Sequence, residues 1–209
     1  MKPVSASLQL AAANAAAIVA SNTPTGAGAL TLVSSPWVAD VPRRVLVTYG
    51  NEASSRTVQI TGTDRSGFPL KETVTVPSGA LGTVATNNDF ATVTQVQVFA
   101  AWTAAMSVGT NTVASSAWFS VQTQVTPCAI GIGVTVAGTV DYTVEYTYED
   151  PNALPAGITW PDIFSLSALA TKTTTLDSAI TQPVAAFRLT VNSGTGTARM
   201  GAVQAGVWQ

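Results

Sequence analysis

The residues with the clearest capacity for chemistry are the carboxylates of the stretch from 139 to 150. Asp141, Glu145 and Glu149 fall at every fourth position on one face of a predicted strand, and Asp150 follows. Calcium takes roughly six to eight converging oxygen ligands, whereas residues four apart on a strand lie about 13 Å from one another. Paired carboxylates for sugar hydrolysis must face each other across a cleft, and the sequence does not indicate which acids approach. A polar face turned to solvent or to a partner fits these residues better.

Several residue types that enzymes and metal sites use are missing. The chain has no His, which is the commonest general base and metal ligand, and Cys128 is its only cysteine. One cysteine can form neither an internal disulfide nor a cysteine-based metal site. Gly131-Ile132-Gly133 lies within a predicted strand with no Lys after it, so it is not a phosphate-binding loop. We therefore expect no enzymatic activity, no catalytic residue, no cofactor and no metal.

The five tryptophans allow two interpretations. They can form the sugar-stacking platform of a carbohydrate-binding sandwich, or they can fill cores and subunit interfaces. Trp118, beside Phe119 in an apolar run, is predicted to lie in a core. Trp37 follows a proline at a predicted sheet edge, Trp160 lies in a predicted loop and Trp208 lies near the end of the chain, so we expect these three at an interface. Exposed, coplanar rings would favour sugar binding, and buried rings would count against it.

Composition limits the kinds of partner. Only 10% of the 209 residues are charged, against roughly 25% in ordinary soluble domains. The net charge is −2, so the chain has no basic surface for nucleic acid or an anionic membrane. Residues 1–20 resemble a secretory signal, but Gln9 and Asn14 interrupt the apolar run, and no other run is long enough to span a membrane. Such low charge indicates a surface covered largely by neighbouring proteins.

The strongest local pattern is a hairpin in residues 56–76. Apolar residues alternate with Thr and Gln on both predicted strands, with Glu72 as the one exception. Between them, Asp64-Arg65-Ser66-Gly67 can form a type I turn, because the Asp64 side chain can accept hydrogen bonds from the following backbone and Gly67 can adopt a positive φ. Asp64 and Gly67 are therefore predicted to be structural turn residues.

Similar alternation along the rest of the chain predicts an all-β fold. Short strands from residue 29 to about 121 would form a first sandwich, and a second hairpin over 130–148 opens another. We expect two consecutive antiparallel β-sandwich modules, jelly-roll-like, over 29–122 and 123–209. Residues 1–28 are predicted to be an N-terminal arm, helical or extended, that packs on a neighbouring subunit; deleting it should leave both modules folded.

Several blocks of the chain carry a family likeness. The block ITGTDRSGFPLKETVTVP, followed by NNDFATVTQVQV and SVGT, resembles small all-β structural proteins of tailed bacteriophage particles, with the pattern Gly-Thr-Asp-x-x-Gly-x-x-x-x-Glu-Thr. VPRRVLVTYGNEASSRTVQI, GTVDYTVEYTYEDP, TWPD and PVAAFRLTVNSGTG look like further blocks of that group. The resemblance implies a non-enzymatic virion protein, made in the host cytoplasm, that assembles with copies of itself and other tail or capsid proteins.

Three roles remain open at this point. A tail or tail-fibre component is the first expectation, and a capsid decoration or cement protein is the second. A carbohydrate-binding module on the virion surface, or a weak sugar hydrolase, is the third.

Overall fold

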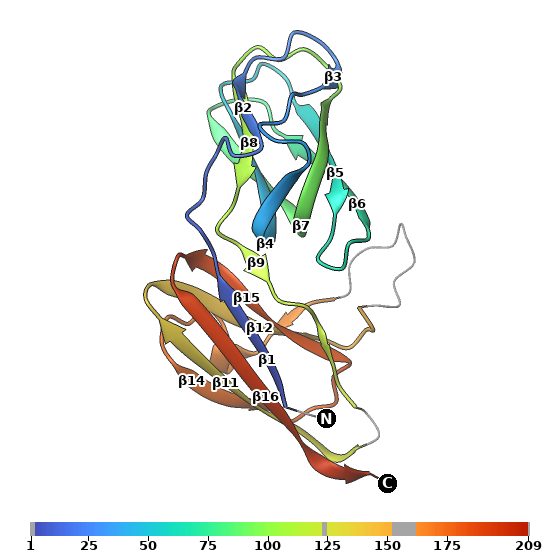
Figure 1. Ribbon diagram of the computed structural model, residues 1–209, viewed down its shortest axis with the longest axis vertical. Coiled ribbons are helices and arrows are strands. Elements are labelled where there is room, and N and C mark those ends of the chain that lie inside the picture. Colours follow the sequence, from blue (N-terminus) through green and yellow to red (C-terminus); the bar gives the residue numbers. More distant parts are fainter. Residues whose placement is uncertain (1–2, 123–124, 152–161, 209) are drawn as a thin grey trace. The chain divides into compact units, whose positions relative to one another are not determined.

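The computed structural model describes residues 3–122, 125–151 and 162–208, without the side chains of 125–128 and 206–208. Within these ranges the regular structure is β, apart from one 3₁₀ turn, η1 (Ser167–Leu169), so the all-β expectation is confirmed. No helix among these residues has the length and apolar character that a membrane span requires. The chain divides into a continuous unit, Ala11–Ala114, and a split unit made of Met1–Leu10 and Ser115–Gln209. Figure 1 shows the strands of both units.

The continuous unit contains one seven-stranded sheet, in the order β2-β8-β4-β7-β5-β6, with β3 paired to β7. Its strands are β2 (Val19–Asn22), β3 (Gly28–Ala29), β4 (Trp37–Tyr49), β5 (Arg56–Thr63), β6 (Pro69–Val76), β7 (Gly82–Val98) and β8 (Met106–Thr110). The 17-residue β7 pairs with β4 along most of its length and with β5 near its end. Buried residues of these strands and of the residues before β2 form one hydrophobic core.

The predicted hairpin is β5 and β6, paired from Arg56 with Val76 to Thr63 with Pro69. Val58, Ile60 and Val74 are buried on its inner face, as the alternation requires. Glu72 breaks the pattern because its carboxylate has partners on β7, which are described below. The local sequence therefore predicts the hairpin correctly. Glu72 is the exception, because its position depends on contacts with β7.

The split unit contains two antiparallel sheets. One has the order β1-β16-β11-β14, and the other has β10-β15-β12-β13 with β9 also paired to β15. The strands are β1 (Val4–Gln9), β9 (Ala114–Ser115), β10 (Phe119–Ser120), β11 (Val125–Ala137), β12 (Val140–Thr147), β13 (Phe164–Ser165), β14 (Leu176–Ile180), β15 (Ala186–Gly194) and β16 (Thr197–Trp208). In Figure 1, β1 lies beside β16 although the two come from opposite ends of the sequence.

The N-terminal residues form strands within the units, not the separate arm that we expected over 1–28. β1 completes a sheet of the split unit, where Leu8 and Leu10 are buried. Ile18 and Val19 are buried in the core of the continuous unit. The expected modules 29–122 and 123–209 also differ from the observed division, because Ser115 and the residues after it belong to the split unit. The small side chains of β1 alternate with period two, and a search for a helical stripe misses that pattern.

Candidate interaction surfaces

The predicted turn residues form the tip of the β5–β6 hairpin. Gly67 has a φ of 84°, and its N–H donates to the Asp64 carbonyl oxygen at 3.2 Å. The Asp64 carboxylate accepts hydrogen bonds from the N–H groups of Ser66 (2.8 Å) and Phe68 (2.9 Å). The Asp64 side chain therefore shapes the turn, and its role is structural.

The tryptophans do not form an exposed platform in the described residues. Trp37 was expected at an interface, but it is only 9% exposed and belongs to the core of the continuous unit. Its pairing with Val93 on β7 turns the ring inward. Trp102 is also buried. Trp160 and the side chain of Trp208, the two other interface predictions, lie outside the described residues.

Trp118 is half-buried, so it is not the core residue that the sequence predicts. The guanidinium carbon of Arg188 lies 4.4 Å from the centroid of its ring, a distance typical of a cation–π contact. Arg188 also donates from Nε to a Glu145 carboxylate oxygen at 2.7 Å. One face of the Trp118 ring is thus occupied by a cation.

The predicted acidic face of β12 is used within the sheet. The Glu145 carboxylate accepts from Thr190 at 2.8 Å as well as from Arg188, and Asp141 accepts from the Asn192 side-chain amide at 2.6 Å. All three partners lie on the neighbouring strand β15. In the described part of the chain, no three His, Cys, Asp or Glu side chains gather as a metal site would need. Asp141 and Glu145 hold β12 to β15.

Glu52 is a buried carboxylate that the sequence did not single out. It accepts hydrogen bonds from the N–H groups of Thr103 (2.9 Å) and Ala104 (2.8 Å), and from the Thr103 hydroxyl (3.1 Å). Arg56 Nε lies 3.3 Å from it. Burial favours the neutral acid, but these hydrogen bonds and the Arg56 charge outweigh burial and lower the pKa of Glu52. Its backbone also pairs with Gly79, so Glu52 joins three segments of the continuous unit.

Two further charged groups of the continuous unit bind backbone. The Glu72 carboxylate accepts from the N–H groups of Asn87 (2.6 Å) and Asn88 (3.1 Å) on β7, and from the Asn88 amide (2.7 Å). Arg43 is 1% exposed and donates to the Ala11 carbonyl at 2.6 Å, while Asp40 accepts from the Ala11 N–H at 2.9 Å. Burial lowers the pKa of Arg43, and Asp40 opposes that effect. These charges hold the framework together.

The outer face of the β5, β6 and β7 strands is almost uncharged. Cross-strand partners share a face, and on this face they are hydroxyl and amide side chains with a single cation, Lys71. We call this surface the Thr/Gln face: Thr57, Gln59, Thr61, Lys71, Thr73, Thr75, Gln95 and Gln97. Its residues are exposed or partly exposed. It offers hydrogen-bond donors and acceptors with little charge to desolvate.

Aromatic side chains form a row across one sheet of the split unit, and only part of this row is exposed. Phe119, Phe187, Tyr146 and Phe164 are successive cross-strand partners on β10, β15, β12 and β13. Tyr148 lies 5.4 Å from Phe164, ring centroid to centroid, at an interplanar angle of 62°. Tyr148 is 53% exposed and Phe164 41% exposed. The two exposed rings are inclined, so they do not make the flat platform on which a sugar ring stacks.

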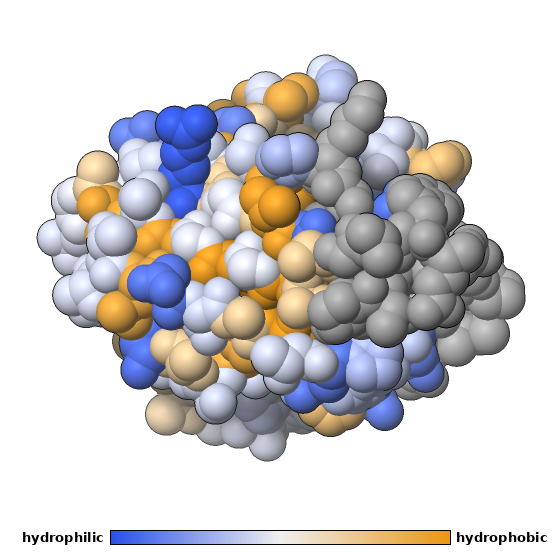
Figure 2. Space-filling model, turned by 90° about the horizontal axis from the view of Figure 1, so that it is seen from below, coloured by the Kyte–Doolittle hydropathy of each residue, from blue (hydrophilic) through white to orange (hydrophobic). Residues whose placement is uncertain are grey.

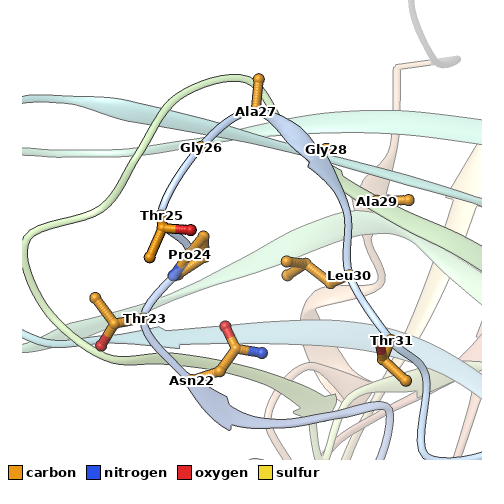
Figure 3. Close-up of a pocket in the computed structure, with 10 residues that line it drawn as sticks. All are labelled: Asn22, Thr23, Pro24, Thr25, Gly26, Ala27, Gly28, Ala29, Leu30 and Thr31. Atoms are coloured by element: carbon orange, nitrogen blue, oxygen red, sulfur yellow. The ribbon is translucent and has the colours of Figure 1, made fainter.

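One open hollow of about 390 Å³ lies inside the loop from Asn22 to Thr31. Figure 3 shows the loop curving around it, with the Leu30 side chain directed into the hollow. All ten lining residues belong to this single loop, and none is charged. The hollow therefore brings together no acid, base or charged ligand-binding group.

Two comparisons with known proteins found no match. No protein-family model matches the sequence, and no curated protein is significantly similar to it.

Proposed function

We propose that this chain is a non-enzymatic structural component of a bacteriophage particle, associated with the tail or its fibres. It assembles there through the surfaces of its β units with other copies of itself and with other virion proteins. The resemblance of the hairpin block to phage structural proteins motivates the location. The arrangement of charge in the structure supports the structural role.

The observation that carries the proposal is the use of charged side chains inside the units. Glu52, Glu72 and Arg43 bind backbone groups, and Glu145 binds residues of the adjacent strand. The Thr/Gln face meanwhile has one cation among eight residues. Figure 2 shows another part of the surface, where strongly hydrophilic residues (blue) form separate clusters among residues of intermediate hydropathy (pale) and hydrophobic residues (orange). Surfaces of this kind lose little hydration energy when a protein partner covers them.

Location in a purified particle tests the proposal. Antibodies against the purified chain would be used for immunogold electron microscopy of particles of the phage that encodes it. We expect gold on the tail or its fibres, and the chain in the protein profile of gradient-purified particles. Gold confined to the head would replace the tail assignment by capsid decoration. Absence of the chain from purified particles would overturn the virion role altogether.

Sugar binding is less well supported. Trp37 and Trp102 are buried, Trp118 has Arg188 on its ring, and the exposed rings of Tyr148 and Phe164 are inclined. None of these described aromatic residues gives the exposed coplanar rings that sugar binding would favour. The capsid decoration role differs from the tail role only in location, so the same labelling experiment separates them.

A further inference from the structure

The outer edge of β1 is an open hydrogen-bonding surface. β1 is the first strand in the order β1-β16-β11-β14, so it has a strand neighbour on one side only. Its six residues pair with β16 from Val4 with Ala202 to Gln9 with Thr197. On the other side, no described strand pairs with it. A strand in this position presents unpaired N–H and C=O groups that can accept a further strand.

The other edge strands in the described residues carry features that discourage such pairing. β6 has Pro69 and Lys71, and β14 has Asp177. β2 has four residues and an irregular register, and β10 and β13 have two residues each. Prolines, charges, irregularities and short length are the usual protections of natural sheet edges. β1 has the sequence VSASLQ, with neither a charge nor a proline.

The sequence of β1 is suited to pairing with itself. Val4-Ser5-Ala6-Ser7-Leu8 has the same pattern from either end: apolar, Ser, Ala, Ser, apolar. If two copies pair antiparallel about a two-fold axis at Ala6, Val4 lies opposite the partner's Leu8. Ser5 then lies opposite the partner's Ser7. Cross-strand residues share a face, so apolar side chains continue the inner face of the sheet and exposed serines continue the outer one.

Absence of charge matters most when the partner is identical. A two-fold interface brings each residue close to the same set of residues in the other copy, so an edge with Lys71 or Asp177 would place like charges near each other. Like charges opposite one another destabilise a strand pair. The uncharged β1 edge avoids this repulsion, and its Ser and Ala side chains are small enough for close approach.

We propose that the β1 edges of two copies pair antiparallel around Ala6 and join two four-stranded sheets into one continuous sheet. This inference deepens the proposed assembly with other copies of the chain by naming the strand that mediates it. Purified full-length protein tests it in solution, apart from any particle. A failure here would therefore leave the particle location to be decided by the labelling experiment.

Charge substitutions at the two exposed serines test the pairing. Sedimentation analysis over a range of concentrations should show that the wild-type chain forms a dimer. S5K/S7K places Lys opposite Lys in both cross-strand pairs and should weaken the dimer on the order of tenfold or more. S5K/S7E places Lys opposite Glu and should restore the affinity to within about threefold at low salt. T23K/T25K, at two exposed positions of the loop between β2 and β3 and outside the Thr/Gln face, is the matched control and should leave the affinity unchanged.

Melting temperatures of the variants, measured at concentrations where all are monomeric, check that they remain folded. A wild-type chain that stays monomeric at every concentration would overturn the proposal. A dimer that S5K/S7K leaves intact would also overturn it, because the contact would then lie elsewhere.

Disulfide formation tests the register in a Cys128→Ser background. An equimolar mixture of S5C and S7C chains should form a cross-linked dimer on mild oxidation, because these positions are opposite each other. S5C alone and S7C alone should cross-link much less. Preferential cross-linking of S7C with itself would overturn the register centred on Ala6.

Discussion

At the scale of single residues, several charged groups of this protein hold its fold together. Glu52, Glu72 and Asp64 each accept at least two backbone N–H hydrogen bonds, although they lie on different segments. Such bonds satisfy backbone donors of the turn and of neighbouring segments. Among the described acids, Glu52 has a lowered pKa together with nearly complete burial. The stability of the continuous unit should therefore depend on the charge of Glu52.

Replacement of Glu52 by Gln should destabilise the continuous unit by about 2 kcal/mol at neutral pH. The amide oxygen can still accept from the N–H groups of Thr103 and Ala104, because both donate to the same carboxylate oxygen. The N–H₂ group then replaces the oxygen that faces Arg56 Nε, so the attraction to the Arg56 charge is lost and two donors face each other. Urea unfolding at pH 7 measures the change. The exposed Glu149 supplies the matched control, and Glu149→Gln should shift the unfolding midpoint very little.

The effect of Glu52 should also depend on pH in a definite direction. Because its folded-state pKa is lowered, its contribution is fully present above the unfolded value of roughly 4.3. That contribution is lost as pH falls through the lower folded-state pKa. The difference in unfolding free energy between the wild type and Glu52→Gln should therefore shrink at acid pH. A difference that stayed constant from neutral to strongly acid pH would contradict this role for the carboxylate.

At the scale of elements, local pattern predicts a strand well when the residues that specify it are adjacent. The β5–β6 hairpin was predictable because Val58, Ile60 and Val74 alternate with polar residues around a turn with Asp64 and Gly67. β1 was missed because Val4, Ala6 and Leu8 alternate with polar residues, a period that a search for a helical stripe does not detect. Glu52 was missed because its partners lie 51 and 52 residues away. No local pattern marks such a contact.

The close approach of the β5 and β7 backbones at Gly62 can be tested by substitution. β5 and β7 have a register irregularity between Thr61 and Gly62, and a Cβ added to Gly62 would overlap the carbonyl oxygen of Thr92. Gly62→Ala should therefore force the two strands apart and cost about 3 kcal/mol, near the upper end for overpacking. Chemical denaturation measures the loss. Gly28→Ala, where an added Cβ meets no atom within 4 Å, is the control and should be nearly neutral.

At the scale of the whole molecule, the two units differ in the number of chain segments that form them. The continuous unit uses one segment, Ala11–Ala114, whereas the split unit combines Met1–Leu10 with Ser115–Gln209. The sequence alone led us to expect that deletion of residues 1–28 would leave both modules folded. The structure instead predicts that this deletion damages both units. It would remove β1 from one sheet and β2 from the other. The boundary could not be predicted from composition, because a strand from one end of the chain completes a sheet at the other.

Fragments of the chain test whether the continuous unit folds alone and whether the split unit needs β1. Residues 11–114 contain every strand of the seven-stranded sheet, so this fragment should unfold cooperatively on its own. Residues 115–209 lack β1, and with it the side chains of Leu8 and Leu10, which are 2% and 1% exposed in the whole chain. Burial of each leucine contributes about 1.5–3 kcal/mol. The second fragment should therefore melt at a clearly lower temperature, or without a cooperative transition.

A synthetic peptide of residues 1–10 should restore the missing strand. It can pair with β16 in the register of Val4 with Ala202 to Gln9 with Thr197 and fill the space that the two leucines leave. We expect the melting temperature of the 115–209 fragment to rise with peptide concentration until it saturates. A peptide with Leu8→Ala should bind on the order of tenfold more weakly or worse, since it loses buried side-chain contacts. Gln9→Ala, at an exposed position, should bind like the natural peptide. If the fragment melts at the same temperature with and without peptide, β1 contributes nothing to the stability of the split unit, and the N-terminal residues are free for another role.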